Sequence, residues 1–353
     1  MNSGKICEKA LSGKDLTLEE ITHLLNSSGK EYDILRNYAC KTREKFVGNT
    51  VHLRGLIEFS NVCTCDCRYC GIRKSNHAVS RYTMSAEEIL AAAEYSWKTG
   101  YGSVVLQSGE RRDDVFVDFV ADITREIKKL SSGELGITLS CGVQSPDVYK
   151  YWKESGADRY LLRIETTDEK LFASLHPDGD FAKRKQALID LKTCGYITGT
   201  GVMTGLPGQT CEMLARDIEY FHALGADMIG LGPYVTHQEA VLEEFGSDSA
   251  ERQRKRLELA YKMIAVCRIV LKNVNIASAT ALSALDPKRG RLEGLLSGAN
   301  VIMPNTGTFC RRKDYNLYNN KPDTGEPLEA IQKSVNASGC TLELFTQGNP
   351  PRP

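Results

Sequence analysis

The spacing of hydrophobic positions changes near residue 50. Before it, apolar residues recur with a helical period: the capping box Thr17–Glu20 opens one helix that we expect to end at Gly29, and a second helix is expected over 31–46. After it, short β-branched segments alternate with amphipathic helical stretches. This change predicts a helical extension over residues 1–50 that precedes a domain built around a sheet.

Eight segments have the composition of buried strands, and a helical stretch follows each of the first seven. The expected strands are 51–59, 103–107, 136–141, 159–164, 197–204, 228–233, 273–280 and 299–303. The expected helices between them are 85–98, 114–130, 146–155, 182–193, 210–223, 250–271 and 289–296. Strict alternation predicts an α/β fold with a parallel sheet, most simply a closed (β/α)8 barrel of the TIM type. An open, doubly wound sheet is the alternative.

A chain of 353 residues is long for an ordinary domain, but single (β/α)8 barrels reach this size. We expect the barrel over residues 51–305. The remainder, 306–353, is polar and contains the loop sequence KPDTGEP, so it is expected to form a C-terminal extension that packs on the barrel.

The charge balance excludes some partners. Lysine and arginine together number 45, as do aspartate and glutamate, so the formal net charge is zero. Nucleic-acid-binding chains are typically basic, so we expect no such partner. No segment approaches the roughly 20 apolar residues that span a bilayer, and the first residues lack the apolar core of a signal peptide. We therefore expect a cytoplasmic protein without a membrane partner, acting on a small molecule.

The strongest functional signal is the run CTCDCRYC at residues 63–70. Cys63, Cys67 and Cys70 have the spacing C-x3-C-x2-C, with Tyr69 just before the last cysteine. Closely spaced thiolates can ligate three corners of a 4Fe–4S cluster, which leaves one iron open to a small molecule. This spacing is typical of radical S-adenosylmethionine (SAM) enzymes, in which the open iron binds SAM.

Cys65 leaves a second interpretation open. With it the run offers four thiolates, which is a ligand set that tetrahedral zinc accepts. A non-catalytic zinc-binding or iron–sulfur scaffold is therefore the alternative from another class. The strand–helix alternation that begins beside the motif favours the enzyme, and we expect Cys65 to point away from the cluster. The chain has 12 cysteines and no signal peptide, which indicates reduced thiols and a metal site.

Polar residues stand at several strand ends, where a barrel carries its chemistry. Arg163 and Glu165 alternate along the fourth strand and therefore share one face. If that face lines the barrel interior, the two charges hold a polar ligand; the alternative is a buried structural ion pair. Further candidates are Arg54 in the first strand, Gln107, Ser108 and Glu110 after the second, Thr138 in the third and Thr280 at the end of the seventh.

Long stretches of the chain resemble HydE, the family of radical SAM maturases of FeFe-hydrogenases. The likeness runs from about Tyr38 to about Tyr318 and is carried by VHLRGLIEFSNVCTCDCRYCGIR, RYTMSAEEI, VVLQSGE, ADRYLLRIET, TGLPGQT and GANVIMPN. Biotin synthase and methylornithine synthase are similar in fold but match these stretches less closely. The resemblance implies a barrel enzyme that reductively cleaves SAM to a 5′-deoxyadenosyl radical and acts in assembly of the hydrogenase H-cluster.

The resemblance also implies residue roles. Cys63, Cys67 and Cys70 would hold one 4Fe–4S cluster with one open iron. The implied cofactor-binding residues are Tyr69, Gln107, Ser108, Glu165, Arg184, Met228 and Tyr315. The implied substrate cavity is lined by Arg54, Thr138, Arg163, Thr280, Ala281 and Tyr318. Arginines inside a barrel suit an anionic substrate.

The implied partners are an iron complex or other small-molecule substrate, a ferredoxin-type or reductase electron donor, and the other hydrogenase maturases. Two departures from the family pattern matter. Some members carry a second cysteine cluster in the tail, whereas residues 316–330 contain no cysteine, so one cluster is expected. Ile164 stands where the best-known version has histidine. The alternative within the class is therefore a HydE-like enzyme acting on a different sulfur-containing or amino-acid-derived substrate.

Overall fold

The structure is a computed structural model that describes residues 2–242, 248–307, 313–321 and 327–351. Three helices precede the first strand: α1 (Ser3–Leu11), α2 (Leu18–Leu25) and α3 (Gly29–Val47). Thr17 and Glu20 form the predicted capping box, which satisfies N–H groups at the start of α2. Gly29, expected to end the first helix, instead begins α3, because the chain already leaves the helix after Leu25.

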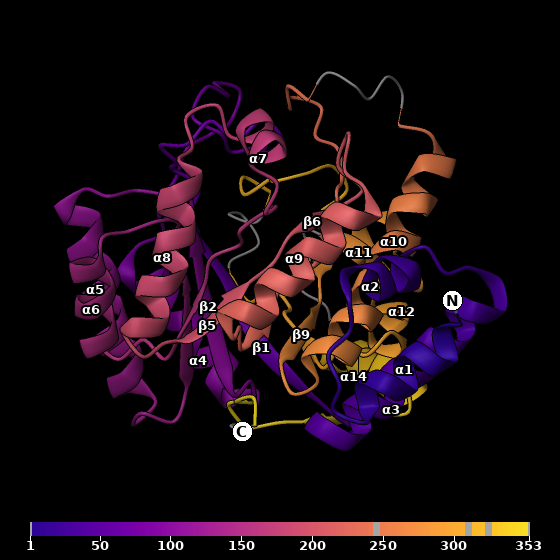
Figure 1. The fold of residues 1–353 in the computed structure, drawn as a ribbon. Helices are drawn as coiled ribbons and strands as arrows, with labels where there is room; N and C mark the ends of the chain where they lie inside the picture. Colours follow the sequence, from indigo (N-terminus) through magenta and orange to yellow (C-terminus); the bar gives the residue numbers. More distant parts are fainter. Residues whose placement is uncertain (1, 243–247, 308–312, 322–326, 352–353) are drawn as a thin grey trace.

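Eight parallel strands close into a barrel, and their order around the barrel is their order along the chain (Figure 1). They are β1 (Thr50–Ser60), β2 (Ser103–Ser108), β3 (Gly136–Ser140), β4 (Arg159–Leu161), β5 (Ile197–Thr200), β7 (Met228–Ile229), β9 (Asn275–Ser278) and β10 (Val301–Ile302). The ring closes where His52 and Leu53 pair with β10. The open, doubly wound alternative is therefore wrong, and every predicted strand segment overlaps an observed strand.

Helices cover the outside of the barrel, as the apolar outer face of a parallel sheet requires. They are α4 (Ala86–Lys98), α5 (Asp114–Leu130), α6 (Pro146–Glu154), α7 (Glu169–Leu175), α8 (Phe181–Thr193), α9 (Cys211–Leu224), α10 (Ala250–Leu271), α11 (Thr280–Leu285) and α12 (Gly290–Leu296). The N-terminal helices pack against α9 and α10 on one side of the barrel (Figure 1). None of the helices in the described part of the chain is long and apolar enough to cross a membrane.

Two of the predicted strands are each split in two. Beyond β5 and β7 the chain forms a separate pair, β6 (Met203–Thr204) and β8 (Gly232–Pro233). The backbones approach closely at the break, where a Cβ added to Gly201 would lie 2.0 Å from the carbonyl oxygen of Gly230. Glycine is required at such an approach because any side chain would collide with the neighbouring backbone.

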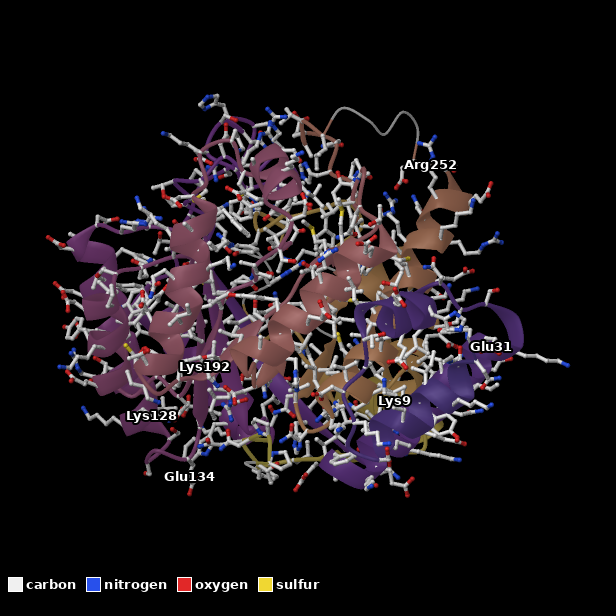
Figure 2. All side chains as sticks on the ribbon, in the orientation of Figure 1. Lys9, Glu31, Lys128, Glu134, Lys192 and Arg252 are labelled. Carbon is white, nitrogen blue, oxygen red and sulfur yellow. The ribbon has the colours of Figure 1, made fainter. Side chains whose placement is uncertain are left out.

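Two acidic residues brace the end of the barrel opposite the cysteine run. Asp158, just before β4, accepts a backbone N–H of β3 and pairs with Lys128 of α5 at 2.7 Å. Asp227, just before β7, accepts a backbone N–H of β5 and pairs with Lys192 of α8 at 3.0 Å. Figure 2 shows both lysines toward this end of the molecule. Each pair joins the end of a helix to the beginnings of two strands.

The C-terminal part of the chain returns to the same end, which we call the floor of the barrel (Figure 1). α14 (Leu328–Ala337) leads into β11 (Thr341–Glu343), which pairs in parallel with the first residues of β1. The sequence predicts an extension in this region but neither this helix nor this strand. The proposed division of the chain at residues 50 and 305 stays a prediction.

The segment that follows β11 covers the floor. The buried Arg159 donates to the carbonyl of Gln347 at 2.7 Å and also contacts the side chain of Asn349. Asn275 donates from its side-chain amide to the carbonyl of Gly348 at 2.7 Å. Backbone carbonyls of the tail therefore satisfy polar side chains that point into the barrel from its strands.

We expect a chain that ends at Thr346 to be less stable than the full chain. Its free energy of unfolding should fall by about 2 kcal/mol, because a hydrogen bond to a charged group typically contributes about 1.5–3 kcal/mol. Urea denaturation measures the difference. A chain that ends at Pro351 is the matched control and should stay within about 0.5 kcal/mol of the full chain. Equal losses in the two truncations would contradict the role given to residues 347–349.

Candidate active site

The cysteine run leaves the carboxyl end of β1 as a tight loop. The Cys70 N–H donates to the carbonyl of Cys67 at 3.0 Å. The loop is fixed to the end of β2, because the N–H of Thr64 donates to the carbonyl of Glu110 at 2.9 Å. Cys63, Cys67 and Cys70 therefore stand, half-buried, at the rim formed by the carboxyl ends of the strands, where the sequence predicts them.

Cys63 is surrounded by donors. Its Sγ accepts the N–H of Glu110 at 3.4 Å and that of Cys65 at 3.5 Å. The Cys65 thiol also hydrogen-bonds to it, which lowers the pKa of Cys63 to about 7 and raises the pKa of Cys65. Burial raises the pKa of Cys67 and, to about 12, that of Cys70. Cys65 thus lies against Cys63, and its expected orientation away from the cluster stays a prediction.

His176 fixes the orientation of Tyr69. Burial, reinforced by the charge of Arg184, lowers the pKa of His176 to about 3, so the ring is neutral. Its Nδ1 lies 3.1 Å from the carbonyl of Phe172, which only accepts, so Nδ1 carries the proton. Nε2 then accepts the hydroxyl of Tyr69 at 3.1 Å, and the two rings meet edge to face. No sequence pattern marks His176, because its partner lies 107 positions away.

Arg163 and Glu165 share a face, as predicted. Nη2 of Arg163 lies 3.0 Å from Oε2 of Glu165, which is an ion-pair distance, yet neither atom has a hydrogen bond and both are buried. Glu165 has a φ of 69°, in the left-handed region that residues other than glycine seldom adopt. Arg184 donates from Nε to the carbonyl of Arg163 at 2.8 Å. Buried polar atoms without partners, on a constrained backbone, mark a place suited to a polar ligand.

Residues 313–321 complete one wall of the site. Tyr315 is fully buried, and Lys321 donates to its carbonyl at 2.7 Å while lying over its ring. Lys321 also pairs with Glu58 of β1 at 2.5 Å. Burial, followed by the charge of Glu58, raises the pKa of Tyr318, whereas Arg163 lowers it. Tyr318 is therefore a half-buried side chain near the charges of both Glu58 and Arg163.

The end of β2 supports the cysteine loop. A Cβ added to Gly109 would lie 2.4 Å from a carbonyl oxygen of that loop, so glycine allows the close contact. Ser108, which is buried, donates to the carbonyl of Gly109, and Gln107 is half-buried beside it in β2. Glu110 accepts the N–H of Val143 at 2.8 Å. The carboxylate of Glu110 is thus used in holding two strand ends together.

The interior of the barrel below the rim contains a small cavity of about 20 Å³, lined by Arg54, Thr138 and Met228 among others. Arg54 donates from Nη1 to Sδ of Met228 at 2.9 Å, and Oγ1 of Thr138 is buried without a hydrogen-bond partner. Met228 is the first residue of β7 and therefore lies toward the floor. Met228 shares this deeper cavity with Arg54, and its role as a cofactor contact stays a prediction.

Thr280 and Ala281 begin α11 directly after β9. Thr280 lines a second, larger cavity of about 450 Å³, and Ala281 lies beside Gly232 of β8. The predicted substrate residues therefore fall into three neighbouring groups: Arg54 with Thr138, Arg163 with Tyr318, and Thr280 with Ala281.

Asp217 of α9 holds the loop that follows Glu165. Its Oδ1 accepts the N–H and the hydroxyl of Thr167 at 2.6 and 2.7 Å. Burial outweighs these hydrogen bonds and raises the pKa of Asp217 to about 7. The sequence shows only one more acidic residue in an amphipathic helix, so this role was not predicted.

Residues 57–221 match the Radical SAM superfamily, and this range contains the cysteine run, Arg163, Glu165 and Arg184. With the closed barrel, this match defines a radical SAM enzyme, a class that carries a 4Fe–4S cluster and binds SAM. The chain belongs to the HydE family. It is 40% identical over 347 residues to the [FeFe] hydrogenase maturase subunit HydE of Thermotoga maritima, a match that covers 98% of this chain and 94% of that protein.

Other relatives are more distant. The chain is 27% identical over 301 residues to 3-methylornithine synthase of Methanosarcina acetivorans, covering 84% of this chain and 81% of that one. Among solved structures it is similar to methylornithine synthase (PylB), with a TM-score of 0.82, 23% identity and coverage of 96% and 98%. It is also similar to the maturase HydG from Carboxydothermus hydrogenoformans, with a TM-score of 0.80, 21% identity and coverage of 98% and 80%. These two structures establish the fold.

The described residues fit the cofactors of this class. Cys63 is held by donors that favour its thiolate, the form that binds metals. Among the described residues, no three Cys, His, Asp or Glu side chains come together as ligands of a single metal ion. A 4Fe–4S cluster has no such requirement, because each thiolate binds a different iron. Arg163 and Glu165 form an ion pair, but their buried atoms make no hydrogen bond, so they suit the charged groups of SAM or of a substrate.

Asp217 makes stability depend on pH. Its pKa is raised from 3.8 to about 7, so between these values the unfolded state releases a proton that the folded state keeps. The contribution of Asp217 to stability is therefore present below about pH 4 and lost as the pH rises through 7. We expect Asp217→Asn to match the wild type near pH 4 and to exceed its free energy of unfolding by roughly 3 kcal/mol at pH 8.

Urea denaturation at both pH values measures this difference. Glu219→Gln is the control, because Glu219 lies on the same helix and is exposed. A pH-independent effect of Asp217→Asn, or an equal gain from Glu219→Gln, would contradict the assignment.

Proposed function

We propose that the protein is a HydE-type maturase that acts in assembly of the H-cluster of an FeFe-hydrogenase. The observation that carries this proposal is the 40% identity to HydE of T. maritima, which extends over nearly the whole of both chains. The cysteine run at the rim of a closed barrel agrees with it. Cys63, Cys67 and Cys70 hold one 4Fe–4S cluster, with one iron left open for SAM. A reduced cluster of this kind supplies the electron that cleaves SAM into methionine and a 5′-deoxyadenosyl radical.

Residues at the rim bind and orient SAM. Glu165 and Arg184 offer a carboxylate and a guanidinium to its charged and hydroxyl groups. Gln107 and Ser108, at the end of β2, line the side of the site beside the cysteine loop. Tyr69, held by His176, and the buried Tyr315 shield the site from water. These roles together fix the position of SAM and keep the reaction away from solvent.

Residues inside the barrel bind the substrate. They are Arg54, Thr138, Arg163, Thr280, Ala281 and Tyr318. Two buried nitrogens of Arg163 and the buried hydroxyl of Thr138 make no hydrogen bond, so both residues have hydrogen bonds to offer. A small anionic iron complex fits this chemistry, since guanidinium groups bind anions strongly.

The departure at Ile164 does not favour a different substrate. Ile164 is fully buried in the hydrophobic core, and its N–H donates to Thr200. It lies beyond the end of β4, between Arg163 and Glu165, and its side chain is taken up by the core. The partners of the reaction are a ferredoxin-type or reductase electron donor and the other hydrogenase maturases, and we propose a cytoplasmic location.

Anaerobic reconstitution tests the proposal. We expect about four irons per chain, release of 5′-deoxyadenosine with dithionite and SAM, and activation of an FeFe-hydrogenase in a host that lacks its own HydE. Binding of zinc alone, or no cleavage of SAM by the reduced protein, would overturn the enzyme class. Cleavage of SAM without activation of the hydrogenase would overturn the substrate only.

Within that assay, Cys67→Ala should abolish SAM cleavage and lower the iron content, because it removes one of three ligands. Cys65→Ser is the matched control, since it keeps a small hydrogen-bonding side chain next to Cys63. It should retain cleavage and iron content. Loss of the cluster in Cys65→Ser would show that Cys65 is itself a ligand.

The ion pair between Arg163 and Glu165 offers a further test. If Glu165 binds SAM and Arg163 binds the substrate, Glu165→Gln should weaken SAM binding about 10-fold or more, the loss expected for one charge-assisted hydrogen bond. Arg163→Gln should leave SAM binding within about 2-fold and reduce hydrogenase activation instead. Isothermal titration of the cluster-loaded protein with SAM measures the first effect. Equal weakening by both substitutions would indicate a purely structural ion pair.

A further inference from the structure

The larger cavity, of about 450 Å³, opens on the side of the barrel rather than at its rim. It is lined by residues of α11, of α12, of the segment after β10 and of α14, all on one side of the barrel (Figure 1). Ser283, Ala330 and Ser334 are small residues among them, and Lys333 is exposed to solvent at the outer end. The cavity therefore communicates with the surface between α11 and α14.

The inner end of this cavity reaches the barrel interior. Leu56, which also lines the cavity, lies on the same face of β1 as Arg54 and Glu58. Both of those side chains point into the barrel, so Leu56 does too. Met303 lines both this cavity and the smaller one that contains Arg54 and Thr138. The side cavity and the interior cavity thus share Met303 as a wall residue.

An interruption of the barrel wall explains the opening. β9 ends at Ser278 and the chain turns into α11 at Thr280, so β9 does not extend toward the rim. On the other side, Pro304 follows β10 and has no N–H with which to continue the ladder toward β9. Its carbonyl pairs only with β1, where it accepts the N–H of Leu56 at 2.8 Å. Above the level of Ser278 the wall between β9 and β10 is therefore open.

The described part of the lining of the side cavity is basic. It includes Lys288, Arg291, Lys321 and Lys333, and none of the described residues that line it is acidic. Lys321, at the inner end, is paired with Glu58, and Arg291 also has a partner, so the exposed side chains of Lys288 and Lys333 make the outer end of the cavity positive. A low-dielectric cleft with charges of one sign attracts and concentrates small ions of the other sign.

We propose that this cavity is a lateral passage through which a small anion reaches the barrel interior without crossing the rim that binds SAM. The existence of the passage does not depend on the proposed function. Its use as the route of the maturation substrate does rest on the proposed function. Separate routes allow SAM to remain bound at the rim while a second reactant enters from the side.

Cysteine accessibility tests the passage in the cluster-loaded protein. Leu56→Cys places a thiol at the inner end, and the anionic reagent 2-sulfonatoethyl methanethiosulfonate is the probe, with labelling at residue 56 followed by peptide mass spectrometry. Ala330→Trp, added to this variant, obstructs the outer end and should slow labelling about 10-fold. Asn336→Trp is the matched control, because Asn336 is exposed on α14 but does not line the cavity, and should change the rate by less than 2-fold.

Saturating SAM distinguishes the two routes. It should leave the labelling rate unchanged if the reagent enters from the side. Slowing by SAM, with no effect of Ala330→Trp, would overturn the proposal. Met303→Cys provides a second reporter in case Leu56→Cys does not fold.

Charge reversal tests the class of ligand. The double variant Lys288→Glu with Lys333→Glu should slow the anionic reagent about 10-fold and speed its trimethylammonium analogue. Equal rates for the two reagents in both backgrounds would overturn the anion selectivity. None of these measurements uses a hydrogenase, so failure of hydrogenase activation would count against the proposed function and leave the labelling result standing.

Discussion

The structure depends on one short contact, the pairing of His52 and Leu53 with Val301 and Ile302. This pairing joins the two ends of the sheet and turns eight strands into a closed ring. Closure brings all the carboxyl ends of the strands to one rim, which is where β1 delivers the cysteines and the chain after β4 delivers Glu165. It also creates an interior that water does not fill freely, so charges such as Arg54 and Arg163 must find partners among protein groups or ligands. The candidate active site therefore depends on closure of the barrel.

Most of the fold is readable from the sequence because the barrel follows local rules. Most strands lie in short apolar segments and most helices begin at a side-chain cap, as at Ser85 and Glu88 for α4. The regions that escape prediction are those whose structure depends on distant contacts. β11 is only three residues long and forms because it finds the beginning of β1. The breaks within two strands arise where the backbones of Gly201 and Gly230 approach, which no single segment reveals.

The candidate site shows the same division. The ligand cysteines carry their own spacing, and Arg163 and Glu165 reveal a shared face through strand periodicity. Residues that act through tertiary contacts have no such pattern. His176 is recognisable only through Tyr69 and Phe172, and Asp217 only through Thr167. The depth of Met228 within the barrel follows from its place at the start of β7, which sequence order does not show. The hydrogen bond between the thiols of Cys65 and Cys63 likewise depends on the tight turn of the loop.

The covered floor has a consequence for how the chain acquires its structure. The carbonyl of Gly348 that receives Arg54 lies 294 positions farther along the chain, and β10 must also be in place before the ring can close. Contacts between such distant segments form late, because a long loop must first be ordered. During synthesis the strands β1 to β5 therefore exist for some time as an incomplete ring whose arginines are exposed to water. Docking of the tail is the step that seals this arrangement, so the integrity of the last few residues reports on completion of the whole barrel.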